Sequence, residues 1–85
     1  MPEVMMYGTQ NCPFCRRAEE LLKNKGVADL EKIAVDRDPE LLQTMMARTG
    51  RRSVPQIFIG EIHVGGYDDL AELARAGRLD ALLQG

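Results

Sequence analysis

The spacing of apolar residues predicts a strand and then a helix in the first part of the chain. Residues 3–7, EVMMY, form an apolar run that predicts a buried strand. Residues 13–25 predict an amphipathic helix, because apolar residues recur there at spacings of three and four: Phe14, Ala18, Leu21 and Leu22. Pro13 suits the first helical turn, and Gly26 is the expected stop.

A second strand and a second helix follow. Residues 30–35, LEKIAV, predict the strand. Residues 39–50 predict the helix, with Asp38 as its cap, Pro39 as its first residue and Gly50 as its end.

The last part of the chain predicts a hairpin and a third helix. Residues 56–64, QIFIGEIHV, are two apolar runs around Gly60-Glu61, which indicates two strands joined by a two-residue turn. Asp68 is the expected cap of the helix after it, whose buried face is Leu70, Leu73 and Ala74. Residues 80–84 are expected to add one further helical turn.

These elements follow one another in the order β-α-β-α-β-β-α. The order predicts an α/β fold with a four-stranded mixed sheet and three helices distributed over both of its faces. The two-residue turn makes the last two strands antiparallel. Because the sequence contains no linker, repeat or low-complexity stretch, we expect residues 1–85 to form one domain.

Composition and charge narrow the classes of function. The chain is 45% hydrophobic and 28% charged, which is typical of a folded rather than a disordered protein. Its net charge of −2 argues against nucleic-acid binding, which favours a basic face. No apolar run is long enough to span a bilayer, and no signal-peptide core follows Met1. We therefore expect a cytosolic protein that binds neither nucleic acid nor membrane.

Both cysteines lie in one short stretch, NCPFC at residues 11–15. Cys12 precedes the first turn of the predicted helix and Cys15 lies inside that turn, so the two thiols can reach each other. Free backbone N–H groups and the positive end of the helix dipole converge on Cys12 and favour its thiolate. Cys12 is therefore the expected nucleophile and Cys15 the expected resolving thiol. Arg16 is a candidate stabiliser of the thiolate; the alternative is a solvated arginine.

Three other functions of the cysteine pair remain open at this point. A structural disulfide would close a very short loop and add little stability. A structural zinc site needs four ligands, and the chain offers two cysteines and His63, which alternates with Ile62 and Val64 and is expected to face outward. We therefore expect no metal ligands. The third alternative is an iron–sulfur cluster bridged between two copies of the chain.

Three motifs carry a resemblance to a known family. A C-x-x-C that follows a first strand and opens a helix is the thioredoxin-like arrangement. CPFC at residues 12–15 resembles the CPYC of dithiol glutaredoxins, not the Trp-Cys-Gly-Pro-Cys of thioredoxins. SVPQIFIG at residues 53–60 resembles the TVP segment of glutaredoxins, and GGYDDL at residues 65–70 resembles the GG-x-D-D-L that opens their last helix. The chain resembles small bacterial dithiol glutaredoxins, in particular the third bacterial class.

The resemblance implies a thioredoxin-like fold and glutathione-dependent reduction of protein disulfides and glutathione mixed disulfides. Cys12 would attack a glutathione mixed disulfide, and Cys15 would complete dithiol exchange by forming a redox-active disulfide with it. Pro55 matches the cis-proline of the family. The implied glutathione-binding residues are Pro13, Phe14, Ser53, Val54, Pro55, Gly66, Tyr67 and Asp68.

Within that set, the resemblance implies a division of labour. The backbone of Val54 would pair with the cysteine unit of glutathione like an added strand. Backbone N–H groups of Tyr67 and Asp68 would hold the γ-glutamyl carboxylate, and the Asp68 side chain would face the ammonium. Glutathione would be a co-substrate, with no permanently bound cofactor. Protein disulfides and glutathionylated proteins would be the partners of a monomer.

The sequence also departs from the family pattern. Thr9 stands where many glutaredoxins carry a lysine that is thought to meet a glutathione carboxylate. We expect Arg52, beside Arg51, to take over the contact with the glycine carboxylate near Thr9. The alternative is that both arginines lie in solvent. Three further positions differ from the usual Tyr, Thr and Cys of this class: Phe14, Ser53 and Tyr67.

Two rival functions follow from the family itself. Some glutaredoxin-like proteins are recharged by thioredoxin reductase instead of glutathione. Single-thiol members with CGFS carry iron–sulfur clusters, and CPFC does not match that motif.

Overall fold

The computed structural model describes residues 1–85 and contains four strands and four helices. The strands are β1 (Val4–Gly8), β2 (Leu30–Ala34), β3 (Gln56–Ile59) and β4 (Ile62–Gly65). The helices are α1 (Pro13–Asn24), α2 (Pro39–Thr49), α3 (Tyr67–Arg75) and α4 (Leu79–Gln84). The predicted elements are therefore confirmed in type and order, with ends that differ by one or two residues.

The four strands form one mixed sheet in the order β2-β1-β3-β4. β1 runs parallel to β2 and antiparallel to β3, and β3 and β4 form the expected antiparallel hairpin. The chain enters the sheet at β1, crosses through α1 to β2, and then returns through α2 to the other side of β1. The cysteine stretch follows β1, and residues 51–55 precede β3. Because β1 and β3 are antiparallel neighbours, both segments lie at the same end of the sheet.

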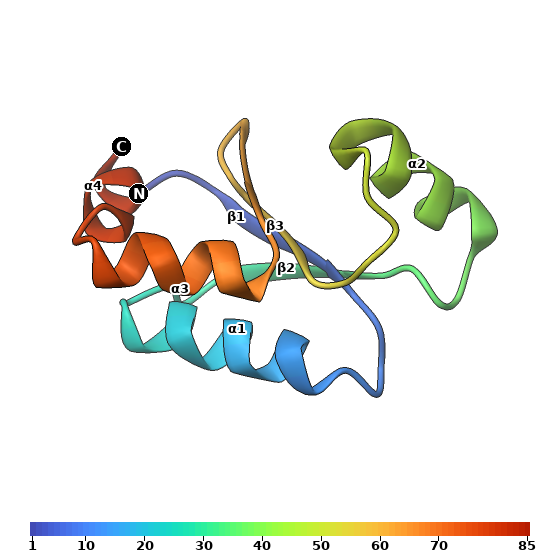
Figure 1. The fold of residues 1–85 in the computed structure, drawn as a ribbon, viewed down its shortest axis with the longest axis horizontal. Helices are drawn as coiled ribbons and strands as arrows, with labels where there is room; N and C mark the ends of the chain where they lie inside the picture. The colour runs from blue at the N-terminus through green and yellow to red at the C-terminus, as the bar shows by residue number, and fades with distance from the viewer.

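Alternation along the central strands divides the core between two faces. On one face, Val4 and Met6 of β1 and Ile57 and Ile59 of β3 pack with α1, α3 and α4. On the other face, Tyr7, Val35, Met45 and Phe58 form a smaller cluster under α2. Figure 1 shows α1 and α3 together on one side of the sheet and α2 on the other. Helices on both faces of a mixed sheet confirm the predicted fold class.

The helical turn predicted near the end of the chain forms a separate short helix, α4. The sequence predicts three helices, with an extra turn at residues 80–84. After α3 the chain turns at Gly77, whose φ of +71° suits glycine, and α4 begins at Leu79 and covers these residues. Leu79 and Leu83 are buried in the larger core cluster, which explains why this short segment stays helical.

The start of α3 also differs from the prediction. Gly66, not Asp68, is the N-cap, and Tyr67 is the first helical residue. The carboxylate of Asp69 reaches back and accepts a hydrogen bond of 2.9 Å from the Gly66 N–H. Asp68 is exposed on the first turn. None of the helices combines the length and the apolar character needed to cross a bilayer.

Candidate active site

Cys12 and Cys15 meet at the beginning of α1 as the sequence predicts. Cys12 is the N-cap of the helix, Pro13 occupies the first helical position, and the two cysteines form a disulfide. The backbone N–H of Cys15 donates a hydrogen bond of 3.1 Å to Cys12 Sγ, so the sulfur itself caps the helix. A Cβ at Gly8 would lie 3.1 Å from Cys15 Sγ, which explains the glycine at the end of β1.

The segment before β3 lies against this sulfur. The peptide bond between Val54 and Pro55 is cis, as the resemblance implies. The carbonyl oxygen of Val54 lies 4.0 Å from Cys12 Sγ, although 42 residues separate them in the sequence. The backbone of Val54 therefore forms one side of the surroundings of Cys12 Sγ.

A cleft of about 220 Å³ opens beside this segment. Seven residues of the predicted glutathione-binding set line it: Phe14, Ser53, Val54, Pro55, Gly66, Tyr67 and Asp68. Arg51 and Asp69 complete the lining, and Pro13 is the one member of the set that lies outside it. One wall is the segment before β3 and the other is the N-terminus of α3, where backbone N–H groups favour an anion.

Two aromatic rings flank the cleft. Phe14 comes from α1 and Tyr67 from α3, and their ring centroids are 6.0 Å apart. Phe14 is half exposed, and the guanidinium of Arg17 lies 5.3 Å from its ring centroid. A flexible substrate would therefore meet an apolar edge next to the polar cleft.

A second cavity of about 380 Å³ lies on the other side of the disulfide. Thr9, Arg16 and Arg37 line it together with both cysteines. The structure thus places Arg16 and Thr9 near the sulfurs but outside the first cleft, the one lined by Val54, which we call the Val54 cleft. Arg52 is exposed and lines neither cavity, whereas Arg51 lies in the wall of the first.

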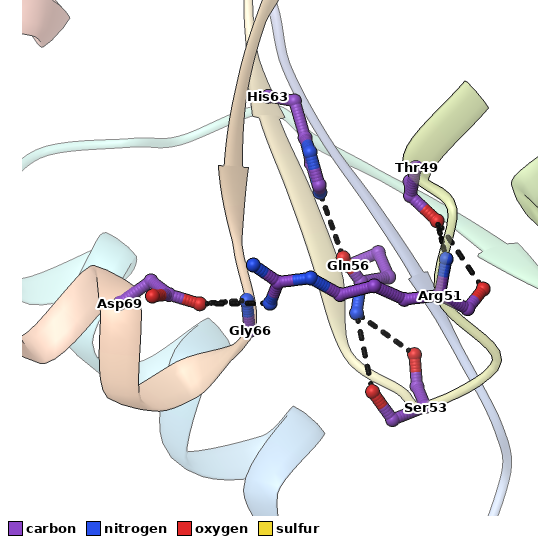
Figure 2. A network of polar contacts seen from close by, with 7 residues as sticks. All are labelled: Thr49, Arg51, Ser53, Gln56, His63, Gly66 and Asp69. Carbon is purple, nitrogen blue, oxygen red and sulfur yellow. Dashed lines mark hydrogen bonds and ion pairs between the residues drawn. The ribbon is translucent and has the colours of Figure 1, made fainter.

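Arg51 bridges the two walls of the Val54 cleft. Its Nη1 lies 3.0 Å from Asp69 Oδ2, the same oxygen that accepts the hydrogen bond from Gly66 N–H. Figure 2 shows the arginine reaching across from the segment before β3 toward α3. The hydrogen bond from Gly66 and then the Arg51 guanidinium hold the pKa of the Asp69 carboxyl below its usual value.

A second polar link lies behind the same wall. Gln56, the first residue of β3, is fully buried, and its Nε2 donates to the Ser53 carbonyl oxygen at 3.0 Å. Its Oε1 lies 2.7 Å from His63 Nε2 on β4 (Figure 2). Burial and then the charge of Arg51 lower the pKa of His63.

His63 does not face outward as its alternation with Ile62 and Val64 predicts. Ile59 pairs with Ile62 across the two-residue turn, so His63 lies directly opposite Phe58, on the face of the sheet that α2 also covers. The two rings stack with centroids 5.0 Å apart, which leaves the imidazole half-buried. No three His, Cys, Asp or Glu side chains are grouped so that they could hold a metal ion.

Sequence reasoning missed Asp69, Gln56 and His63 as parts of this site. The adjacent acids of YDDL signal that a carboxylate caps α3, but not which of the two does so. Gln56 stands out only as a polar residue at the start of an otherwise apolar run, which is a weak signal for burial.

Comparison with known proteins agrees with this geometry. The family model described as Glutaredoxin matches residues 4–64. The chain is 55% identical to a glutaredoxin of Pseudomonas aeruginosa over 83 residues, which are 98% of each protein. It is 43% identical to glutaredoxin 3 of Escherichia coli over 84 residues, 99% of this chain and 100% of that protein.

A solved structure of a relative has the same fold as this chain. The crystal structure of a buckwheat glutaredoxin–glutathione complex matches 98% of this chain and 77% of the buckwheat chain, with a TM-score of 0.88 and 29% identity. Family model, relatives and fold agree on one assignment, and the Cys12–Cys15 disulfide supplies the chemistry that it requires. The chain belongs to the glutaredoxin family and is a thiol–disulfide oxidoreductase of the small bacterial type.

Proposed function

We propose that this protein reduces protein disulfides and glutathione mixed disulfides, and that glutathione restores its dithiol. The observation that carries the proposal is the position of Val54, whose carbonyl oxygen lies 4.0 Å from Cys12 Sγ at the edge of the cleft. A peptide that pairs with an exposed backbone edge gains affinity from main-chain hydrogen bonds. The cysteine unit of glutathione, paired with Val54, would present its sulfur to Cys12.

The opposite wall of the cleft fits the other end of glutathione. The backbone N–H groups of Tyr67 and Asp68 lie in the first turn of α3, where a carboxylate is favoured. The exposed Asp68 carboxylate would face the ammonium of the γ-glutamyl unit. Ser53, Pro55 and Gly66 would shape the walls, and Pro13 and Phe14 would lie on the cysteine side. The solved complex of the buckwheat relative contains glutathione, which supports this assignment.

Reduction of a glutathione mixed disulfide needs one protein thiolate. Cys12 Sγ attacks the glutathionyl sulfur, a Cys12–glutathione disulfide forms, and the substrate leaves as a thiolate that takes up a proton. A second glutathione thiolate then attacks the bound glutathionyl sulfur. Glutathione disulfide leaves, and Cys12 returns as a thiolate, stabilised by the N–H of Cys15 and the N-terminus of α1.

Reduction of a protein disulfide uses both cysteines. Cys12 Sγ attacks one sulfur of the substrate and releases the other as a thiol after protonation. Cys15, as a thiolate, then attacks Cys12 Sγ and releases the second substrate sulfur. The substrate gains two electrons, and the protein is left with the Cys12–Cys15 disulfide, the state that the structure describes. Two glutathione molecules reduce that disulfide and leave as glutathione disulfide.

One chain supplies both thiols and both walls of the cleft, so we infer that the monomer suffices for this chemistry. We place that activity in the cytosol, where the glutathione pool is reducing.

The test is reduction of β-hydroxyethyl disulfide by glutathione, coupled to glutathione reductase. We expect turnover that depends on glutathione and on Cys12. Recharging of the oxidised protein by thioredoxin reductase but not by glutathione would contradict the proposal. A coloured protein after anaerobic purification would instead support the iron–sulfur alternative.

A further inference from the structure

We propose that Gln56 and His63 are positioning residues for the reaction, because together they hold the Ser53 carbonyl and thereby the Val54 edge in front of Cys12. The inference rests on the proposed function, since it concerns how the glutathione-binding edge is kept in place. Neither Gln56 nor His63 lines the cleft itself, and Gln56 hydrogen-bonds the lining residue Ser53, so both would act through the backbone of Ser53 and Val54.

Gln56 is an unusual residue for its environment. It is fully buried at the start of β3, and the three residues that follow it are all apolar and buried. A buried amide is costly unless its donors and acceptor are paired. All of its buried polar atoms have partners in this structure. The amide is therefore tolerated because it makes specific hydrogen bonds, which an apolar residue at this position could not make.

The direction of each hydrogen bond is fixed by chemistry. The Ser53 carbonyl oxygen can only accept, so the atom of Gln56 that faces it at 3.0 Å must be the amide nitrogen. The amide oxygen then faces His63, and His63 Nε2 must carry a hydrogen and donate at 2.7 Å. Both the neutral Nε2–H tautomer and the imidazolium can do so. The chain of donors thus runs from His63 through Gln56 to Ser53.

The imidazole is itself held in place. It stacks on Phe58, which is buried and lies under the guanidinium of Arg48 at 4.0 Å from its ring centroid. The chain of hydrogen bonds therefore begins at a ring fixed in the core between β3, β4 and α2. It ends one residue before Val54, whose carbonyl oxygen lies 4.0 Å from Cys12 Sγ.

The effect on catalysis follows from geometry. An exposed segment between two elements has many conformations, and only one of them pairs with the substrate while leaving its sulfur in line with Cys12. A displacement of about 1 Å of a positioning group can lower a reaction rate by roughly 100-fold. Loss of the hydrogen bond between His63 and Gln56 would leave the bond between Gln56 and the Ser53 carbonyl in place. We therefore expect a decrease in rate smaller than about 100-fold.

The experiment compares variants in the reduction of a glutathionylated peptide. His63→Phe keeps a ring to stack on Phe58 but removes the donor, and it should lower kcat/KM about tenfold. His63→Gln places an amide nitrogen near the former Nε2 and should recover most of that loss. Gln56→Leu removes both links with an apolar side chain of similar size, so it should fold, and it should show a larger loss than His63→Phe because it also frees the Ser53 carbonyl. The double variant should be no worse than Gln56→Leu, because that substitution already breaks the whole chain of contacts.

A second readout separates positioning from general loosening. Dithiothreitol reduces the Cys12–Cys15 disulfide without pairing with Val54, so its rate should change less than about twofold in every variant. Ile62→Gln, an exposed change on the same strand, is the matched control and should behave as wild type in both assays.

Three outcomes would overturn the inference: full activity of His63→Phe, equal losses with dithiothreitol and with the glutathionylated peptide, or no recovery in His63→Gln. A wild-type protein without activity on the glutathionylated peptide would overturn the proposed function together with this inference. An active wild type with unaffected variants would overturn the inference alone.

Discussion

The guanidinium of Arg51 and the carboxylate of Asp69 form an ion pair of 3.0 Å that joins the segment before β3 to the first turn of α3. Both side chains are almost half exposed, so the charge pair by itself contributes little stability. The ion pair matters because Asp69 Oδ2 also accepts a hydrogen bond from the N–H of Gly66, the N-cap of α3. The two walls of the Val54 cleft are thereby tied to the same atom.

Asp69 should make the protein less stable in acid. Its carboxyl has a lowered pKa in the folded state, so the unfolded chain binds more protons as the pH falls. The contribution of Asp69 to the free energy of unfolding is complete above pH 3.8, the ordinary pKa of this carboxyl. It is lost as the pH falls through the lower pKa of the folded state. Urea unfolding between pH 2.5 and 7 should therefore show a shallower acid limb for Asp69→Asn than for wild type. Glu72→Gln on the same helix controls for the loss of one charge, and an Asp69→Asn curve parallel to wild type would contradict the assignment.

His63 should add a second, separate pH dependence. It is the only histidine of the chain, and burial and Arg51 lower its pKa below 6.5. Its contribution to stability is present above pH 6.5 and is lost as the pH falls through the folded pKa, because the unfolded chain binds the proton first. The proton NMR titration of the single imidazole should show a midpoint below that of a model peptide. A midpoint at or above the peptide value would show that the ring is not desolvated on Phe58.

Substitution of each cysteine should affect a different set of reactions. Cys12→Ser should abolish all exchange, because the first nucleophile is lost. Cys15→Ser should lose the reduction of protein disulfides such as insulin but keep the reduction of a glutathionylated peptide, which needs only the attacking thiol. Activity of Cys12→Ser on the peptide, with an inactive Cys15→Ser, would reverse the roles.

Arg52 remains our candidate for the glycine carboxylate of glutathione, although it lies outside the cleft lining. An exposed charge pair contributes ~0.2–1 kcal/mol, so Arg52→Ala should raise the apparent KM for glutathione up to several-fold at low salt and less at high salt. Thr9→Lys should partly restore the affinity of that variant. A KM equal to that of wild type at low ionic strength would leave the carboxylate in solvent.

Gly65 should tolerate no side chain. Its φ is +117°, and a Cβ there would lie 2.8 Å from Asp69 Cγ. Gly77 is the matched control, because its φ is also positive, at +71°, but a Cβ would meet no atom within 4 Å. Gly77→Ala should lower the free energy of unfolding by about 1–2 kcal/mol. Gly65→Ala should lower it further, because Asp69 must also release Gly66 N–H. Equal losses in urea unfolding would show that the carboxylate moves aside freely.

The fold and the cysteine centre could be predicted because their signals are local. Periodicity sets each element, and Cys12 and Cys15 lie three residues apart at a helix start, so no long-range information is needed to bring them together. The cis bond before Pro55 has no local signal and was implied by the resemblance alone.

The polar network behind the cleft could not be predicted because it depends on which distant elements cover each face of the sheet. His63 lies on the opposite face from Val64, as simple alternation predicts, but Phe58 and α2 cover that face, so the imidazole is not left in solvent. Likewise, nothing in the sequence shows that Arg51 rather than Arg52 faces α3, since adjacent residues differ only in the direction of their side chains.

The sulfur of Cys12 is both the reacting atom and the cap of α1. Each catalytic cycle therefore changes the bonding partner of the atom that caps the beginning of α1. The first turn of this helix must stay ordered while Cys12 is a thiolate, a mixed disulfide or part of the disulfide with Cys15. Serine is among the preferred N-caps, whereas alanine there costs about 0.5–2 kcal/mol. An inactive but intact protein, suited to trapping substrates or to crystallisation with glutathione, is thus obtained with serine at this position and not with alanine.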